Sequence, residues 1–309
     1  MTHPLCKTPT AAVVISPWVY VKLVLVTLFW GGTFIAGRVL AQSLPLLTAA
    51  AARFAVAVVL LLVVAWKFEG GLPRLTRSQW LATAALGTTG IFIYNVCFFG
   101  ALAHMPAGRT ALFVAFNPIV TALLAAVLLR ERLGTVKWVG IAIALTGAVT
   151  IITRGDPLSA FYDMGRSIGT GELLMFAAIT AWAAYTLIGR AVLKDLSPIA
   201  ATTYAALWGL LFLGIGAAFE MGTVNWWAVG WQVWVCIFYI GIFGTVIGFI
   251  WYYEGVKAIG SSHTAVFNNL VPVFGVVLAA LLLGEPILVS MIVGGALAIV
   301  GVSITNRAP

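Results

Sequence analysis

The chain has 309 residues, of which 62% are hydrophobic and only 8% are charged, and its mean hydropathy is +1.08. Soluble domains carry about 25% charged residues, so this composition excludes a soluble globular protein and predicts an integral membrane protein. The net charge of +8 does not indicate a nucleic-acid partner, because the basic residues fall mainly in predicted loops on one side of the membrane.

Apolar segments follow one another along the chain, and about twenty apolar helical residues suffice to cross a bilayer. The predicted spans cover 18–40, 45–66, 79–101, 108–129, 136–153, 171–192, 198–219, 231–253, 264–283 and 287–305. The N-terminus lacks the charged region of a signal peptide, so we interpret the first segment as a span. The predicted fold class is therefore an all-α integral membrane protein with ten transmembrane helices.

The spans are written twice, with an offset of about 153 residues. Trp30, followed after six residues by Gly37-Arg38, recurs as Trp182, followed after six residues by Gly189-Arg190. A second motif has a Thr-Ala pair, a proline, a glutamate and two glycines at identical spacings. It comprises Thr110, Pro118, Glu131, Gly140 and Gly147 in the first copy and Thr264, Pro272, Glu285, Gly294 and Gly301 in the second.

Each copy holds five spans, an odd number, so the second copy enters the membrane from the opposite side and the repeats are inverted. Inverted repeats allow a central site to be exposed to each side in turn. The expected organisation is an N-terminal tail at 1–17, a first repeat at 18–153, a linker at 154–170, a second repeat at 171–305 and a C-terminal tail at 306–309.

Basic residues distribute unequally between the two sides, which predicts that both termini are cytoplasmic. Twelve fall inside in that orientation: Lys7, Lys22, Lys67, Arg74, Arg77, Arg130, Arg132, Lys137, Arg190, Lys194, Lys257 and Arg307. Four fall outside: Arg38, Arg109, Arg154 and Arg166. The three cysteines lack paired spacing, so we expect no disulfide and no metal site. We also expect no cofactor.

Trp30 and Trp182 occupy matching positions and precede small residues that allow close approach. Each either lines a cavity or packs with its indole N–H satisfied by a carbonyl.

Arg53 lies near mid-depth of the second span, on the order of 13 Å from the boundary. A charge there costs roughly 2.5–3.5 kcal/mol. All nine acidic residues fall in loops or at span ends. Arg53 is therefore expected either to bind a substrate carboxylate or to be solvated by carbonyls freed at a kink. Its counterpart in the second half is Ala206.

Pro118 and Pro272 interrupt the fourth and ninth spans at equivalent points and are candidate kink or gating residues, each freeing a carbonyl four residues earlier. Carboxamides sit beside both interruptions, and in hydrocarbon they persist where they are buried in protein or face a watery cavity. These candidates are Asn117, Asn268 and Asn269. A kink that serves helix packing alone is the alternative.

Three further residues, Tyr94, Asn95 and Tyr185, complete the substrate-binding candidates as a polar and aromatic wall. Energy coupling stays open, since no carboxylate lies at mid-depth. Glu254, at the end of the eighth span, is the nearest alternative for proton coupling. Glu131 and Glu285 are expected at loop junctions, each capping the helix that follows it.

The two halves resemble the paired EamA domains of the drug/metabolite transporter superfamily, in the Trp30 and Trp182 openings and in the motifs that run from Thr110 and from Thr264. The resemblance implies ten helices, a bacterial inner-membrane location and export of amino acids, related metabolites or toxic compounds. It further implies a central cavity among helices one, three, four, six, eight and nine. Six candidates would face it: Trp30, Tyr94, Asn117, Trp182, Tyr185 and Asn268.

The sequence therefore predicts a secondary transporter that exports small metabolites, amino acids or related compounds above all, by alternating access. A membrane-embedded enzyme is an alternative, although no HExxH, aspartate-rich, Gly-x-Ser-x-Gly or Walker motif is present. A passive sensor or scaffold is another, although short loops leave little surface for a partner. The expected partners are a small-molecule substrate and the lipid bilayer, with no nucleic acid, and the chain is a monomer or a homodimer.

Overall fold

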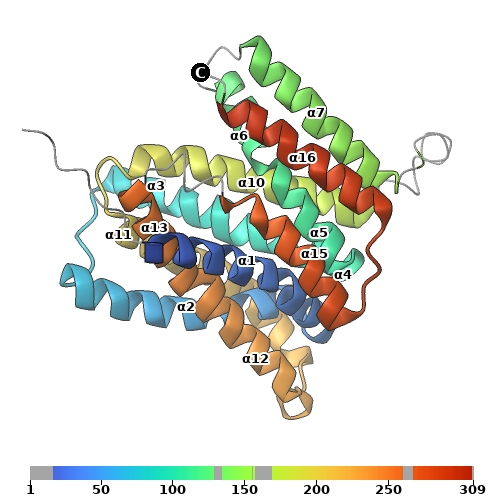
Figure 1. The fold of residues 1–309 in the computed structure, drawn as a ribbon. Helices are drawn as coiled ribbons and strands as arrows, with labels where there is room; N and C mark the ends of the chain where they lie inside the picture. The colour runs from blue at the N-terminus through green and yellow to red at the C-terminus, as the bar shows by residue number, and fades with distance from the viewer. Residues whose placement is uncertain (1–16, 129–133, 155, 157–168, 260–266, 308–309) are drawn as a thin grey trace, which may run out of the picture.

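The computed structural model describes residues 17–128, 134–154, 156, 169–259 and 267–307, and these residues form helices joined by turns and short loops (Figure 1). The first half contains α1 (Pro17–Ser43), α2 (Leu46–Glu69), α3 (Arg77–Leu86), η1 (Gly87–Ile93), α4 (Tyr94–His104), α5 (Ala107–Phe113), η2 (Val114–Phe116), α6 (Asn117–Leu128) and α7 (Thr135–Ile152). The second contains α10 (Thr170–Val192), α11 (Pro198–Glu220), η3 (Met221–Thr223), η4 (Trp226–Ala228), α12 (Trp231–Tyr239), η5 (Ile240–Ile247), α13 (Gly248–Ile259), α15 (Leu270–Leu283) and α16 (Val289–Arg307).

Seven of the described helices are long and apolar enough to cross a membrane. Three shorter apolar helices, at Thr135–Ile151, Leu270–Leu283 and Val289–Ile304, fall where the fifth, ninth and tenth spans were predicted. An all-helical membrane protein is thus the architecture, while the count of ten spans and the inverted repeat stay predictions. Most of the predicted linker at 154–170, the N-terminal tail up to residue 16 and Glu131 lie outside the described residues.

The third and eighth spans each contain a π-helical segment that the sequence pattern does not predict. These segments are η1 and η5, and their first residues, Gly87 and Ile240, are separated by the repeat offset. A π-helical turn is rare and frequently marks a functional site. η1 packs on α11, and η5 packs on α2. Each segment therefore contacts the second helix of the opposite half.

The fourth and ninth spans are interrupted beside the two prolines, as predicted. In the fourth, the short 3-10 turn η2 separates α5 from α6, and the Asn117 N–H donates to the Val114 carbonyl. In the ninth, residues 268–269 form a turn before α15, and the Val271 N–H donates to the Asn268 carbonyl at 3.1 Å. The carbonyl that each proline cannot bond is therefore taken by a tighter local hydrogen bond.

The repeated glycines join the two halves along α7 and α16, which lie side by side in Figure 1. A Cβ added at Gly147 would lie 2.5 Å from the Gly294 carbonyl oxygen, and one added at Gly301 would lie 2.5 Å from the Gly140 carbonyl oxygen. The last two motif positions of each copy therefore pack against those of the other. Small residues allow this backbone approach between membrane helices.

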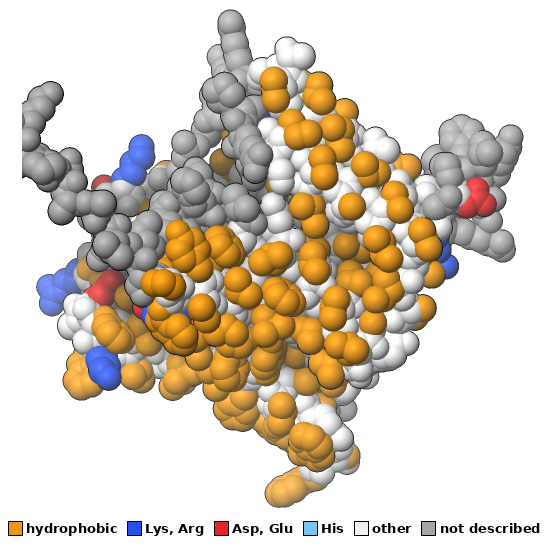
Figure 2. Space-filling view, viewed as in Figure 1, with side chains coloured by type: hydrophobic (Ala, Val, Ile, Leu, Met, Phe, Trp, Pro, Cys, Tyr) orange, Lys and Arg blue, Asp and Glu red, His pale blue; other side chains and the backbone are white. Residues whose placement is uncertain are grey.

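The surface is that of a protein in lipid. Figure 2 shows hydrophobic side chains over the middle of the visible face, with most of the visible Lys and Arg at its left edge, the side on which α1 begins in Figure 1. Fully apolar side chains such as Val59, Leu81 and Ile292 are more than half exposed to the surroundings. In a bilayer this surface faces acyl chains.

Candidate functional site

A cavity of about 190 Å³ lies at the centre of the bundle, between residues of both halves. Its wall is mainly aromatic and apolar, with one charged side chain and a few hydroxyl and amide groups. The lining residues are Trp30, Thr33, Phe34, Arg53, Phe54, Gly90, Ile91, Tyr94, Phe98, Val114, Ala115, Asn117, Trp182, Tyr185, Thr202, Ala206, Gly244, Thr245, Phe249, Asn268, Asn269 and Val271.

The structure brings eight of the nine substrate-binding candidates together in this wall. They are Trp30, Arg53, Tyr94, Asn117, Trp182, Tyr185, Asn268 and Asn269. Asn95 is the exception, because its side chain is fully buried on another side of α4 and its Nδ2 donates to the Ile91 carbonyl at 2.6 Å. This placement gives no support to substrate binding by Asn95. The prolines are not in the wall: Pro272 is buried in α15, and Pro118 is the second residue of α6, where its side chain is not among those described.

The two equivalent tryptophans are held in different ways. The Trp30 Nε1–H donates to the Gly244 carbonyl of η5 at 2.9 Å, and its ring centroid lies 5.4 Å from that of Tyr252. Trp30 thus combines the two roles that the sequence left as alternatives: its indole N–H is satisfied by a carbonyl, and its ring lines the cavity. Trp182 lies between Tyr94 and Tyr185, with ring centroids 5.2 and 5.3 Å away, so this side of the wall is an aromatic cluster.

Arg53 presents an uncompensated charge. Its residue is 9% exposed, its Nε has no hydrogen-bond partner, and it forms no ion pair with any described residue. The guanidinium carbon lies 4.5 Å from the Phe54 ring centroid and 5.9 Å from that of Phe99. Such cation–π contacts contribute about 0.5–2 kcal/mol, less than the roughly 2.5–3.5 kcal/mol that a central arginine costs in a membrane helix. No described carbonyl accepts from Arg53, so the structure gives no support to the carbonyl solvation considered above.

Two helices that the family resemblance did not include also reach the cavity. α2 contributes Arg53 and Phe54, and α11 contributes Thr202 and Ala206. Arg53 and Ala206 occupy equivalent positions in the two repeats. The first repeat therefore places a charged side chain in the cavity wall, and the second places a methyl group there. The sequence could have predicted this second pair of helices, because Arg53 was a candidate for the cavity and the repeat offset places Ala206 at the equivalent position of the second half.

Gly90 and Gly244 also line the cavity and were not among the candidates. They lie at similar places in the two π-helical segments, one in η1 and one in η5. A Cβ at Gly90 would lie 2.2 Å from the Tyr185 ring, and one at Gly244 would lie 2.7 Å from Cγ2 of Thr33. Each glycine therefore lets a cavity-lining side chain of another helix approach the backbone.

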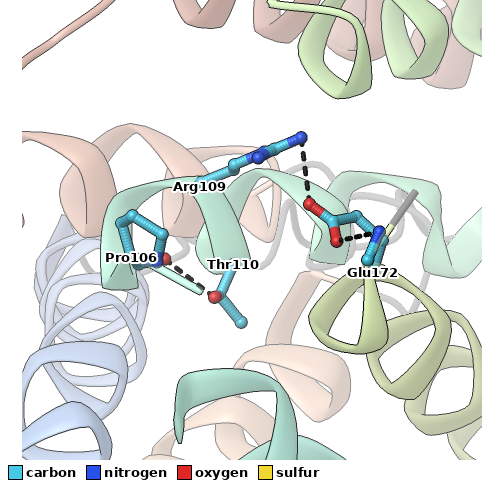
Figure 3. Close-up of polar contacts among 5 residues, drawn as sticks. Pro106, Arg109, Thr110 and Glu172 are labelled. Carbon is cyan, nitrogen blue, oxygen red and sulfur yellow. Dashed lines mark hydrogen bonds and ion pairs between the residues drawn. The ribbon is translucent and has the colours of Figure 1, made fainter. Parts of the chain in front are cut away.

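Polar side chains tie the helices together at the end of the bundle where α1 ends and α2 begins, here called the α1–α2 end. Figure 3 shows Arg109 of α5 paired with Glu172 of α10. The Nη2–Oε1 distance is 3.0 Å, and the two side chains are only 10% and 7% exposed. The other carboxylate oxygen of Glu172 accepts from the Gly169 N–H at 3.0 Å and so caps α10. At the same end, the Arg38 guanidinium donates to the Leu102 and Met105 carbonyls at the end of α4.

Glu285 also lies at the α1–α2 end, at the loop junction where it was expected, but the helix that it was expected to cap was wrong. It does not cap the helix that follows it. Its two carboxylate oxygens accept from the Ala107 and Gly108 N–H groups at 2.8 and 2.9 Å, so it caps α5 of the other half. The reason is the left-handed turn at Gly284, with φ 66°, which redirects the chain at the end of α15. The free N–H groups at the start of α5 then receive a carboxylate, which the helix dipole favours.

Glu254, the nearest candidate for proton coupling, lies away from the cavity wall. Its Oε2 is 2.5 Å from the Lys22 Nζ, and the two side chains are 48% and 22% exposed. The pair joins α13 to α1 at the opposite end of the bundle from Arg109 and Glu172.

Known proteins resemble this chain in sequence and in fold. The model of the EamA-like transporter family matches residues 17–153 and 169–307. YyaM, an uncharacterized transporter of Bacillus subtilis, is 31% identical over 284 residues, 92% of each chain. A probable terminal-alkyne amino-acid exporter of Streptantibioticus cattleyicolor is 30% identical over 295 residues, also 92% of each chain. A solved crystal structure shares the fold, with a TM-score of 0.64 at 19% identity over 93% of this chain and 96% of that one. The protein therefore belongs to the EamA-like transporter family and is a multi-pass membrane transporter.

Proposed function

We propose that the protein is a secondary transporter that exports small metabolites, amino acids and related compounds above all, across the bacterial cytoplasmic membrane by alternating access. The observation that carries the proposal is the central cavity, whose wall is built by helices of both halves and holds eight residues singled out from the sequence. The relative from Streptantibioticus cattleyicolor is similar to this chain over 92% of its length, and its name, probable terminal-alkyne amino-acid exporter, supports the substrate class.

The size of the cavity favours a small metabolite over a drug-sized solute. Its volume of about 190 Å³ exceeds that of an engineered cavity of about 150 Å³ that binds benzene. It falls below the roughly 300–1,000 Å³ of sites for drug-sized ligands. An amino acid with a modest apolar side chain is consistent with this volume and with the aromatic wall.

Alternating access by two inverted five-helix repeats, 18–153 and 171–305, is supported by the contacts between the halves. The Arg109–Glu172 pair and the Glu285 cap on α5 both cross from one half to the other at the α1–α2 end. Opening this end to admit or release a solute must separate some of these groups. We therefore expect the two ends of the bundle to open and close in alternation, so that the cavity is accessible from one side of the membrane at a time.

The orientation we infer has both termini in the cytoplasm and the α1–α2 end outside. The surplus of Lys and Arg in the loops of the opposite end supports this orientation. Lys67, Arg74 and Arg77 lie together there, where α2 ends and α3 begins. Cysteines introduced one at a time into the two sets of loops and labelled with an impermeant maleimide in intact cells would test it. Labelling at residue 74 from outside would contradict it.

Counterflow in proteoliposomes tests the transport proposal. Purified protein is reconstituted with unlabelled solute inside, and uptake of trace labelled amino acids, nucleobases and cationic drugs is measured with no ion gradient. Transient accumulation of one solute class is the expected result. Protein-free vesicles and a wild-type sample inactivated by heat are the controls. No accumulation of any class, either here or under an imposed proton gradient, would contradict the proposal.

A further inference from the structure

The cavity holds a positive charge that nothing in the described structure neutralises. Arg53 is the only charged residue among those lining the cavity, and no described acidic side chain reaches it. Its Nε is buried and has no partner. Buried charges are ordinarily paired, because an unpaired ion in a low-dielectric site is costly. An anionic group on a bound solute would supply the missing partner, and a guanidinium matches a carboxylate in a two-pronged geometry.

The same cavity holds two buried hydrogen-bond acceptors without donors. The Oδ1 atoms of Asn117 and Asn268 are buried and unpartnered in the described structure. The side chains of Asn268 and Tyr252 are hydrogen-bonded to each other. Because the Asn268 Oδ1 has no partner, this bond uses the amide N–H of Asn268. Both asparagines stand at the interruptions of the fourth and ninth spans, one in each half. An ammonium group carries three donors and no acceptor, so it matches such a pair of oxygens.

The two features together specify a ligand with two opposite polar groups. An amine without a carboxylate would leave Arg53 unpaired and would place a second positive charge in its cavity. A carboxylic acid without an amine would leave both carboxamide oxygens without donors. Sites built around buried polar groups reject analogues that lack the matching group. The remaining wall, with Trp30, Trp182 and Tyr185, is aromatic and suits an apolar side chain.

We propose that the cavity selects a small zwitterionic amino acid, whose carboxylate pairs with Arg53, whose ammonium donates to Asn117 and Asn268, and whose apolar side chain lies on the aromatic wall. This inference rests on the proposed function, because it assigns roles within the same transport cavity. It also explains why Arg53 has no counterpart charge at Ala206: a single cation gives the bound zwitterion one orientation.

The test compares three probes that differ only in their polar groups. Binding of leucine, of isopentylamine and of 4-methylpentanoate to the purified full-length protein is measured by displacement of labelled leucine, and methionine and phenylalanine are run with their own matched pairs. At least one amino acid is expected to bind about thirtyfold or more tightly than both of its analogues, the loss typical of leaving a buried charge unpaired. An amine that binds as tightly as its amino acid would overturn the proposal.

Variants separate the two contacts. Arg53→Ala is expected to weaken binding of the amino acid and of the acid at least tenfold, and to strengthen binding of the amine, because it removes a like charge from the cavity. Asn117→Leu, which is similar in size, is expected to weaken the amino acid and the amine and to spare the acid. Equal losses for all three probes in either folded variant would contradict the assignment.

Stability gives a second readout that distinguishes binding from a structural role. Removing an uncompensated charge should leave the melting temperature of the ligand-free protein unchanged or higher, so Arg53→Ala is expected to fold at least as well as wild type. A marked fall in melting temperature, with Arg53→Lys restoring it, would make Arg53 a structural residue and overturn the proposal. Counterflow of a cationic drug or nucleobase but of no amino acid would refute this inference while leaving the transport proposal intact.

Discussion

Replacing Gly147 by alanine is expected to weaken the packing of α7 on α16. The added Cβ would lie 2.5 Å from the Gly294 carbonyl oxygen and 2.8 Å from the Ala298 nitrogen. Both atoms belong to the backbone, so no flexible side chain can move aside, and the two helices must separate. Overpacking of this kind costs about 1–3 kcal/mol.

Gly214→Ala is the matched control, because Gly214 lies within helix α11 and a Cβ there would meet nothing within 4 Å. Alanine gains about 1 kcal/mol of helix propensity over glycine at both positions. That gain cancels in the comparison, so the difference between the variants is the overpacking cost alone. At about 2 °C per kcal/mol for a chain of this size, Gly147→Ala should melt roughly 2–6 °C below Gly214→Ala.

Thermal unfolding of both purified variants in the same detergent, followed by intrinsic tryptophan fluorescence, measures this difference. Wild type is measured alongside, and Gly214→Ala is expected to melt at or slightly above it. Equal melting temperatures for the two alanine variants would refute the claim that these glycines hold α7 and α16 in backbone contact.

Three other perturbations probe the ion pairs and the aromatic wall. Arg109→Met or Glu172→Gln alone should lower the free energy of unfolding by about 3–5 kcal/mol, because each single change leaves an uncompensated buried charge. The double variant should lose less than the sum of the two. Additive losses in a double-mutant unfolding cycle would contradict this. Glu254→Gln should cost less than about 1 kcal/mol, because its pair is partly exposed, and a loss of several kcal/mol in the same unfolding assay would show that the pair is structural. Trp30→Ala and Trp182→Ala should change the order of preference among counterflow substrates before they lower the melting temperature. Unchanged transport of every solute would remove both tryptophans from the cavity.

Much of the fold could be predicted because membrane helices carry a strong signal. Apolar length located the helices closely: the second span, predicted at 45–66, is observed at Leu46–Glu69, and the seventh, predicted at 198–219, is observed at Pro198–Glu220. The repeat offset also paired Trp30 with Trp182, and both tryptophans line the cavity. The π-helical segments η1 and η5 could not be predicted from hydropathy. A change from i+4 to i+5 hydrogen bonding inside a continuous apolar helix does not alter the hydropathy pattern.

Placement in the cavity could be anticipated where a residue was polar at mid-depth, since such a side chain must be buried in protein or face a cavity. That reasoning located Arg53, Asn117 and Asn268. Asn95, which was expected in a polar and aromatic wall, lies outside the cavity wall, because an asparagine within a helix can turn back and donate to the carbonyl one turn earlier, here that of Ile91. The partner of Glu285 was not predicted either. The helix that a carboxylate caps depends on how the two halves pack together, and no local sequence pattern encodes that packing.

The central claim is that solutes cross the membrane through the cavity that Arg53 lines. Ala206→Leu tests it most directly, because Ala206 lines the same cavity and the larger side chain would occupy a substantial part of it. Gly214→Leu is the matched control, because Gly214 lies on the same helix and an added Cβ there would meet nothing from other helices within 4 Å. In counterflow of the best-accumulated labelled amino acid, we expect at least a tenfold loss for Ala206→Leu and near wild-type accumulation for Gly214→Leu. Wild-type accumulation by a correctly folded Ala206→Leu variant would contradict the account.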